Sequence, residues 1–295
     1  MDAPAEIGAS PAPVDPDYFD LKRVRRQLAA HLETLARDVD RLRGDVGFQE
    51  ALQNMARFWR YSLINQFLIM LQRPAATVVA GRRYWETIGR MVKPGERAIA
   101  VIAPSRKHGV LRFRDVPVYD VRQTYGRKLA TVELTLGGRT RHVRTLLRAA
   151  AGLGVEVAFV PLPERVLGRS LGGRVEIQPS IRGRERAAVL AHELAHEVLH
   201  QAERRRAAEA RRPGPQRTHA ECETEADATA YVVLRVLGIP SRAPAYIAWQ
   251  GGTGAGVLRS MTRVQRAAQA ILRASAVRTP GVGRRAAVHD PHRCP

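Results

Sequence analysis

The sequence predicts an α+β protein in two parts: a small N-terminal domain of helices and strands, then a larger helical domain with a short sheet. Residues 92–124 are short β-like runs broken by proline and glycine turns, and residues 184–201 and 218–237 are strongly helical. The 295 residues are enough for two domains with separate cores. We expect one domain at 17–130 and the other at 131–274.

The two ends of the chain have compositions typical of disorder. Residues 1–16 are acidic and rich in Pro and Ala, without the basic and apolar segments of a signal peptide, so we expect a disordered leader. Residues 275–295 are rich in Arg, Pro, Gly and His and predict a basic disordered tail. The longest apolar stretch, Leu63–Leu71, is too short to span a membrane. Cys222 and Cys294 imply no disulfide framework, and we expect a cytoplasmic protein.

The N-terminal half begins with helical patterns. Apolar residues recur at three- and four-residue spacing from Leu21 to Leu42, which predicts an amphipathic helix. A second helix is expected from about Phe48 to Gln72, because Pro74 ends the helical pattern. The β-like runs that follow are Ala98–Ala103 and Val116–Val121, with a turn region at Pro104–Gly109.

The C-terminal half alternates helices with short strands. A helix is expected over about 140–151, and three candidate strands follow before Pro179, the last two separated by Gly172-Gly173. A charged loop at 202–217 then separates the two strongly helical stretches, and a last helix is expected at about 256–274. The sequence therefore predicts a three-stranded sheet ahead of the helices.

The sequence His192-Glu193-Leu194-Ala195-His196 carries a metal-site pattern. Histidines four residues apart on a helix project from one face, within reach of a single ion. Glu193 faces the same cleft, where we expect it to take a proton from zinc-bound water and pass it to a leaving amine. This arrangement is typical of a Zn²⁺-dependent metallopeptidase.

A third protein ligand is expected from the acidic cluster that begins the next helix. Glu223 and Asp227 are four residues apart, so Glu223 can bind the ion while Asp227 accepts a hydrogen bond from a ligand histidine and fixes its tautomer. Glu225 lies on the opposite face and is the second choice. The acidic residues also suit a helix N-terminus, where carboxylates offset the macrodipole.

Other polar residues near the motif are weaker candidates. The side chain of Cys222 points about 100° away from that of Glu223 on a helix, which argues against ligation. His200 lies two turns from His192, so packing or support of a ligand is the expected role. His219 and Tyr231 are candidates for stabilising an oxyanion, with ordinary packing as the alternative.

Basic charge dominates the protein and clusters in the N-terminal half. The chain has 48 Lys+Arg against 28 Asp+Glu, a formal net charge of +20. From Arg57 to Asp115 there are twelve basic residues and three acidic ones. Coding bias toward arginine is one explanation, but a clustered surplus is the electrostatic pattern of a nucleic-acid binder. A basic surface with aromatic side chains is suited to single strands, and the aromatic candidates are Trp59, Tyr61, Tyr84, Trp85, Phe113, Tyr119 and Tyr125.

Several segments of residues 45–250 resemble the ArdC-type antirestriction proteins. The N-terminal segments are Arg60–Gln66, Gln72–Gly81, Tyr84–Arg90, Val92–Glu96, Ile102–Pro104 and Val118–Thr124. The C-terminal ones are His192–His196 and Glu223–Asp227, followed by Ala230-Tyr231 and Leu237–Ile239, which resemble the peptidase domain of that family, related to ImmA/IrrE metallopeptidases. The chain departs from the family at Arg82-Arg83, where a Phe or Trp is more frequent.

The resemblance implies a single-stranded-DNA-binding domain joined to a zincin-like (gluzincin) metallopeptidase domain. It also implies that the protein is encoded on a mobile element and protects incoming DNA from restriction. The expected partners are single-stranded DNA and an unknown protein substrate, restriction-related or a repressor. Two alternatives remain: a DNA-occluding protein with a structural zinc site, and a regulatory protease of the IrrE kind. The candidate DNA contacts are Arg82, Arg83, Arg90, Lys93 and Arg97.

Overall fold

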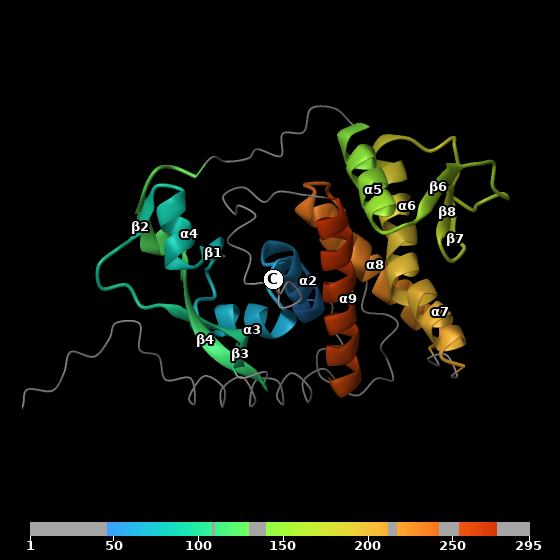
Figure 1. The fold of residues 1–295 in the computed structure, drawn as a ribbon. Coiled ribbons are helices and arrows are strands. Elements are labelled where there is room, and N and C mark those ends of the chain that lie inside the picture. Colours follow the sequence, from blue (N-terminus) through green and yellow to red (C-terminus); the bar gives the residue numbers. More distant parts are fainter. Residues whose placement is uncertain (1–45, 108–109, 130–139, 212–216, 242–253, 276–295) are drawn as a thin grey trace, which may run out of the picture.

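The computed structural model describes residues 46–107, 110–129, 140–211, 217–241 and 254–275 (Figure 1). It confirms the α+β class, with helices and short sheets in both halves of the chain. The leader at 1–16, the helix expected between Leu21 and Leu42, and the tail from residue 276 onward lie outside the described residues. Among the helices that are described, none is long and apolar enough to cross a membrane.

The N-terminal module combines four short helical segments with two small antiparallel sheets. Its sheets have the orders β1-β4-β3 and β2-β5. The long strands β3 and β4 pair from Ile99 with Val118 to Lys107 with Val110. In chain order the elements are α2 (Val46–Arg57), α3 (Leu63–Gln72), β1 (Val79–Ala80), α4 (Arg82–Thr87), β2 (Arg90–Val92), β3 (Ile99–Lys107), β4 (Val110–Asp120), the 3₁₀ turn η1 (Val121–Gln123) and β5 (Thr124–Gly126).

Two expectations for this module were wrong in detail. The single helix expected over 48–72 is two helices, because the side chain of Ser62 caps α3 by accepting a hydrogen bond from the backbone N–H of Asn65 at 3.4 Å. The turn region expected at Pro104–Gly109 is mostly strand, since β3 continues through Pro104 to Lys107. Proline is tolerated there because β3 is an edge strand of its sheet.

The C-terminal part places a three-stranded sheet beside a group of helices (Figure 1). In this sheet β8 pairs in parallel with β6 and antiparallel with β7, which leaves β7 at an edge. The prediction of a loop over 202–217 was wrong for its first half, because residues 202–209 form helix α7. The elements are α5 (Thr140–Gly152), β6 (Glu156–Phe159), β7 (Gly168–Ser170), β8 (Arg174–Ile177), α6 (Gly183–His196), the π-helical turn η2 (Glu197–Gln201), α7 (Ala202–Glu209), α8 (His219–Val236) and α9 (Gly254–Ala274).

One large apolar core extends across both halves of the chain. Leu52, Met55 and Trp59, in or just after α2, are buried in the same cluster as apolar residues of α5, α6, α8 and α9. The side-chain amides of Gln265 and Gln269 on α9 both donate to the carbonyl oxygen of Trp59, at 3.0 and 2.8 Å. Helix α2 therefore packs with the C-terminal helices, although it precedes the predicted domain junction near residue 130, which itself lies outside the described residues.

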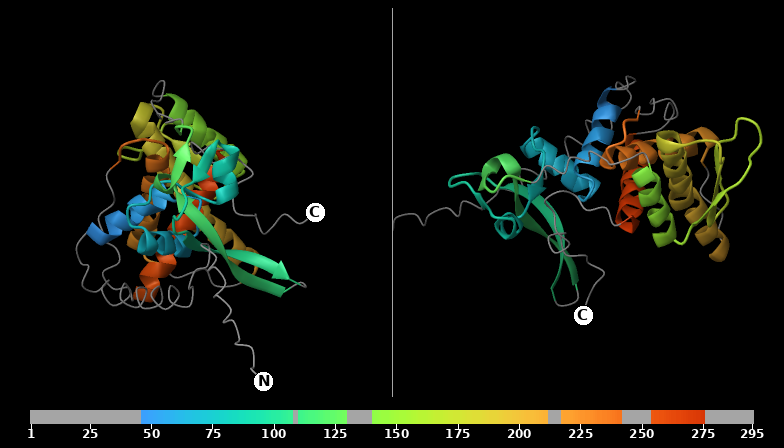
Figure 2. Two further views of the ribbon diagram at one scale, coloured as in Figure 1. Left: turned by 90° about the vertical axis from the view of Figure 1, so that its left-hand side faces the viewer. Right: turned by 90° about the horizontal axis from the view of Figure 1, so that it is seen from above.

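A second, smaller core supports the N-terminal sheets. It joins α3 to β1, β3 and β4, and the right-hand view of Figure 2 shows these strands toward one end of the molecule and helices α5 and α6 toward the other. Its buried members are Phe58, Ile69, Ala76, Val79, Ile99, Val101 and Val118. A neighbouring cluster around Trp85 and Tyr119 fixes α4 against β4.

Candidate metal centre

Helix α6 presents two histidines to one point in space. One face of α6 is buried through Ala187, Leu190, Ala191, Leu194 and Ala195, which holds the helix against the core. His192 and His196 lie on an adjacent face, one turn apart, and their Nε2 atoms are 3.0 Å from each other. The spacing of the two histidines along the helix therefore produces the convergence that the sequence predicted.

Glu223 reaches the same point from α8. The start of α8 is fixed by a capping box, in which Thr218 accepts from the backbone N–H of Glu221 and the Glu221 carboxylate accepts from that of Thr218. Five residues after Thr218, the Glu223 carboxylate lies 3.3 Å from Nε2 of His192 through one oxygen and 3.3 Å from Nε2 of His196 through the other. The ligand atoms of His192, His196 and Glu223 all lie within 4.8 Å of one another, a group that could hold a metal ion.

The donor set fits a tetrahedral divalent ion. Zinc bonds of about 2.0–2.2 Å to nitrogen and oxygen at tetrahedral angles separate the ligand atoms by about 3.3 Å. The separations here are 3.0 Å between the two imidazole nitrogens and 3.3 Å from each nitrogen to the carboxylate. Three protein ligands leave one position of a tetrahedron open to solvent or substrate, as catalytic zinc sites do.

Asp227 orients one of the two histidines. Its carboxylate oxygen Oδ1 lies 2.8 Å from Nδ1 of His192, so Nδ1 carries the proton and Nε2 is left with a lone pair directed at the cluster. Burial lowers the pKa of His192, but the hydrogen bond and charge of Asp227, together with the charges of Glu193 and Glu223, outweigh it and raise the pKa above its ordinary value. Burial and the neighbouring His192 lower the pKa of His196, which keeps that imidazole neutral, as a ligand must be.

Glu193 lies beside the cluster in a buried position. Its side chain is 8% exposed, and burial raises its pKa to about 7. The charge of His192 acts in the opposite direction, while the carboxylates of Glu223 and Glu197 add to the rise. A carboxyl group with a pKa near 7 can both accept and release a proton at neutral pH.

The other candidates near the motif are placed elsewhere. Glu225 is fully buried, and its carboxylate oxygen Oε1 accepts a hydrogen bond from Nε of Arg263 at 3.0 Å. Its carboxylate therefore belongs to an interior ion pair. His200 lies 3.1 Å, through Nε2, from the carbonyl oxygen of Cys222. Tyr231 is buried in the main core. His219 has an 89% exposed side chain, with Nδ1 3.7 Å from a Glu223 oxygen.

Two residues near the centre were missed by sequence reasoning. A Cβ on Gly168 in β7 would lie 2.9 Å from both Cγ and Oε1 of Glu193, so the strand approaches α6 closely enough to exclude any side chain. The buried carboxylate of Glu197 accepts hydrogen bonds from the Ser170 hydroxyl and from the backbone N–H groups of Gly172 and Gly173, at 2.7 to 2.8 Å. Glu197 therefore ties the β7–β8 turn to the end of α6. The Gly172-Gly173 pair was the only sequence signal, and it was interpreted as a turn.

The candidate DNA contacts in the N-terminal module divide into two groups. Arg82, Arg83, Lys93 and Arg97 are exposed. Arg90 is buried: its guanidinium donates to the Thr124 hydroxyl at 2.8 Å, to the Thr124 carbonyl at 3.0 Å, and to the carbonyl of Arg127. We therefore correct the prediction for Arg90, which joins β2 to β5 from the inside. Nothing in the local sequence indicated this role, because all its partners are more than thirty residues away.

Most of the candidate aromatic platforms are also interior. Trp59, Tyr84, Trp85 and Tyr119 are buried, and Trp85 donates its indole N–H to the Tyr119 carbonyl at 3.0 Å. Partly buried Tyr61 donates its hydroxyl to the Val79 carbonyl at 3.0 Å, and the side chain of Phe113 lies outside the described residues. Tyr125 differs from these residues, because its side chain is 52% exposed.

Comparison with protein families identifies a known domain in the N-terminal half. The matching family is described as the N-terminal domain of anti-restriction factor ArdC. Residues 21–127 match its model. This segment contains α2, both small sheets and all five candidate DNA contacts, and it ends before α5. Comparison with curated proteins finds no match to this chain.

Two solved structures are similar to the chain, both of the antirestriction ArdC protein from plasmid R388. The metal-free form has 14% sequence identity and a TM-score of 0.43, and the similarity covers 73% of this chain and 84% of that one. The Mn(II)-bound form has 16% identity and a TM-score of 0.42, with 72% and 88% covered.

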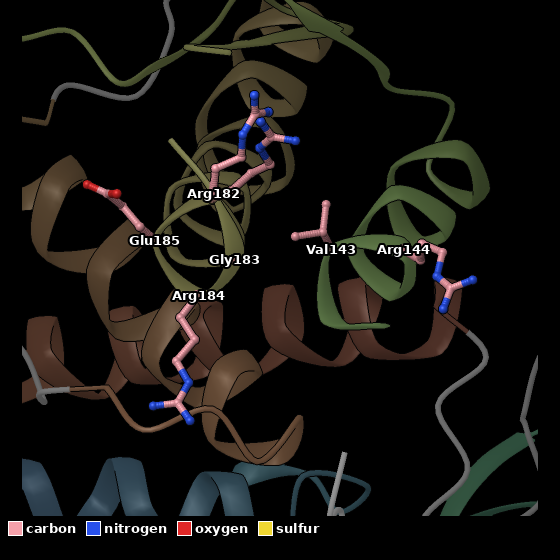
Figure 3. A pocket seen from close by; sticks show the side chains of 7 residues that line it. Val143, Arg144, Arg182, Gly183, Arg184 and Glu185 are labelled. Carbon is pink, nitrogen blue, oxygen red and sulfur yellow. The ribbon is translucent and has the colours of Figure 1, made fainter. Parts of the chain in front are cut away.

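A basic hollow lies outside the ArdC-like segment, at the N-terminus of α6. It has a volume of about 910 Å³ and is lined by Val143, Arg144 and residues 182–186, which include three further arginines and Glu185 (Figure 3). The guanidinium of Arg186 donates to the carbonyls of Ile181 and Pro179, both at 2.9 Å. In Figure 3 the side chains of Arg144 and Arg184 point in different directions. The candidate ligands His192 and His196 lie toward the other end of α6, so the hollow is separate from them.

Proposed function

We propose that the chain is an ArdC-type antirestriction protein, in which an N-terminal module binds single-stranded DNA and a zincin-like domain, related to ImmA/IrrE proteins, hydrolyses a peptide bond. The match of residues 21–127 to the ArdC N-terminal domain supports the DNA-related part. The enzymatic part rests on one observation: three ligand-type side chains converge beside a buried carboxyl group whose pKa is about 7.

The chemistry follows from what each side chain can do. His192, His196 and Glu223 would hold zinc, and Asp227 keeps the His192 ring in the orientation that directs Nε2 at the site. When bound, the ion supplies Lewis acidity that lowers the pKa of a water molecule to about 7. Glu193 accepts the proton of the attacking water on its carboxylate and donates it to the leaving amine nitrogen, and its raised pKa suits both steps.

Glu193 favours this enzyme over a protein with a structural zinc site. A structural site is completed by four protein ligands and needs no base. Among the described residues the cluster has three ligand-type side chains, and Glu193 lies next to it as a buried carboxyl group with a different task. Burying a carboxyl group costs free energy, and a purely structural site gives no reason to keep one there.

Proteolysis assays on the full chain test the enzymatic proposal. Zinc-loaded wild type and Glu193→Gln are incubated with restriction enzymes and with repressor proteins, with and without single-stranded DNA, and new termini are identified by mass spectrometry. We expect cleavage by wild type alone, with equal zinc content in both proteins. If neither protein cleaves any candidate while both hold zinc and bind DNA, the site is structural and the protein acts by occluding DNA.

Binding measurements test the DNA proposal. The full chain should bind single strands more tightly than duplex, and chelation of zinc should not weaken that binding. The exposed basic residues lie on or near α4 and β2, at the opposite end of the molecule from helices α6 and α8, which carry the ligands (Figure 1). If about five phosphates are neutralised, the logarithm of affinity should fall with the logarithm of salt concentration at a slope of about −3.5. Absence of salt-dependent affinity for any oligonucleotide would contradict the proposal.

A further inference from the structure

The small sheet formed by β2 and β5 has one buried face and one open face. Its register pairs Arg90 with Gly126, Met91 with Tyr125 and Val92 with Thr124. Arg90 and Thr124 are buried and hydrogen-bonded to each other, whereas Met91 is 49% exposed and Tyr125 is 52% exposed. Side chains alternate across a strand, so the cross-strand pair Met91 and Tyr125 forms an apolar surface directed to solvent.

This open face is rigidly supported. Beneath it, the Arg90 guanidinium crosslinks the sheet to backbone carbonyls of residues 121–127. Gly126 has a φ of +115°, and a Cβ there would lie 2.5 Å from the Gly89 carbonyl oxygen, so the two strands meet more closely than any side chain allows. Binding to such a surface costs little conformational entropy on the protein side.

Positive charge surrounds the face. Lys93 follows β2 directly, Arg122 precedes β5, and Arg127 and Lys128 follow it, all with exposed side chains. Of the nearby carboxylates, Glu86 on α4 is exposed, a single negative charge against these four positive ones. Asp120 is fully buried and accepts hydrogen bonds from backbone N–H groups. Glu96 accepts from the Gln123 amide at 3.0 Å and lies 3.8 Å from Arg73. The local field therefore attracts anions.

The occupant that fits is a nucleotide of single-stranded DNA. The exposed area of two side chains is far smaller than the area of about 800 Å² that each partner buries in a stable protein interface. An exposed tyrosine ring can stack on the face of one base, while flanking cations contact the phosphates on either side. A duplex does not expose base faces, so the surface selects single strands.

We infer that Tyr125, backed by Met91, is a base-stacking platform in the single-stranded-DNA site of the N-terminal module. The inference rests on the proposed DNA-binding function and locates it on the β2–β5 face. It also gives a role to Tyr84, Trp85 and Tyr119, since Val92 of β2 packs against the buried cluster to which they belong.

Affinity measurements on the full chain test the platform. Fluorescence anisotropy with a labelled oligo-dT is measured over a series of salt concentrations for wild type, Tyr125→Phe and Tyr125→Ala. Tyr125→Ala should weaken binding by about 5- to 150-fold, the equivalent of about 1–3 kcal/mol per stacked base, without changing the salt slope. Tyr125→Phe keeps the ring and should bind within about twofold of wild type.

Two controls separate stacking from general effects. Phe159→Ala removes another exposed aromatic side chain from the other end of the molecule and should leave affinity unchanged. Phe159 is 39% exposed and lies under the Arg186 guanidinium. An oligonucleotide with abasic positions should bind wild type more weakly, but it should not further weaken binding by Tyr125→Ala when the lost base is the one that stacks. Zinc content and melting temperature verify that each variant is folded.

The outcomes are distinguishable. Unchanged affinity of Tyr125→Ala, with wild type binding single strands, overturns the platform and leaves the DNA-binding function standing. A Tyr125→Phe protein as weak as Tyr125→Ala also overturns stacking, since the ring is still present. If wild type binds no oligonucleotide, the proposed function fails, and the platform fails with it.

Discussion

The carboxylate of Asp227 lies 2.8 Å from Nδ1 of His192, one helical turn beyond Glu223 on α8. One helix therefore supplies both the carboxylate that faces the ion site and the carboxylate that orients a histidine of the other helix. The contact between Asp227 and His192 couples the position of α8 to the tautomer of a histidine on α6. A shift of one helix against the other would disturb the contacts of Asp227 and of Glu223 with His192 together.

Asp227→Asn should weaken metal affinity. The amide has the same shape but loses the charge that holds the Nδ1 proton, and such supporting residues are worth about 10- to 100-fold in affinity. Competition with a zinc chelator measures the change, and Arg235→Ala is the control, because Arg235 is an exposed residue near the far end of the same helix. Equal affinities of wild type and Asp227→Asn would show that the contact does not serve the metal.

The ligand set can be tested by elemental analysis. One zinc per chain should be lost in His192→Ala, His196→Ala and Glu223→Ala and retained in Glu193→Gln, because Glu193 is assigned to the proton and not to the ion. Zinc retained by Glu223→Ala and lost by Glu225→Ala would instead make Glu225 the third ligand.

Gly168→Ala should disturb the centre from the side of β7. The new methyl group would lie 2.6 Å from a Val189 methyl carbon and 2.9 Å from the Glu193 side chain, and overpacking of this kind costs about 1–3 kcal/mol. Chemical denaturation measures the loss of stability. The double variant Gly168→Ala/Val189→Ala removes the closest contact and should recover part of it; no recovery would mean that the Glu193 contact dominates.

Arg263→Ala should destabilise the fold strongly. It leaves the fully buried carboxylate of Glu225 without its guanidinium partner, and breaking a buried pair costs about 3–5 kcal/mol. The surface pair of Arg174 and Glu156 is a control, since both side chains are at least 40% exposed and Glu156→Ala should cost about 0–1 kcal/mol. Urea unfolding compares the two, and equal losses would contradict the assignment of Glu225 to the interior.

Acid should destabilise the protein partly through His142. Burial lowers the pKa of this side chain below its ordinary value of 6.5, and Arg184 and Arg141 lower it further. The unfolded chain then binds a proton at a pH where the folded chain does not, so the free energy of unfolding falls as pH falls below about 6.5. His142→Gln cannot titrate and should lose less stability between about pH 7.5 and about pH 5. Equal losses in both proteins would exclude His142 as the cause.

Local patterns predicted the parts of the structure that depend on neighbours in sequence. The four-residue spacing of His192 and His196 determines their common face on any helix, and the spacing of Glu223 and Asp227 does the same on α8. The strands β3 and β4 were predicted in part, as the apolar runs Ala98–Ala103 and Val116–Val121, but their extension through Pro104 was not. The break before α3 was also local, since Ser62 is a typical N-cap, but the apolar run across it obscured the signal.

The features that sequence could not provide depend on distant partners. Arg90 and Arg97 have the same charge and similar neighbours, yet the first is buried under the β2–β5 sheet and the second is exposed. In the same way, the sequence does not distinguish the exposed Tyr125 from the buried Tyr84 and Tyr119, because burial depends on contacts with distant residues. The support given to the β7–β8 turn by Glu197 joins residues 24 to 27 positions apart, which no helical or strand period reveals.

The hydrogen bond from Gln265 on α9 to the carbonyl of Trp59, just after α2, can form only late in synthesis. Gln265 and Trp59 are 206 residues apart in the chain, and a ribosome that adds about 5–20 residues per second needs about 10–40 s to synthesise that length. Helix α2 shares its core with α5, α6, α8 and α9, all of which follow it in the chain, so its apolar side is covered in steps as these helices are made. Cotranslational folding of this protein therefore leaves its earliest described helix exposed to aggregation and to chaperones until the C-terminal helices have left the ribosome.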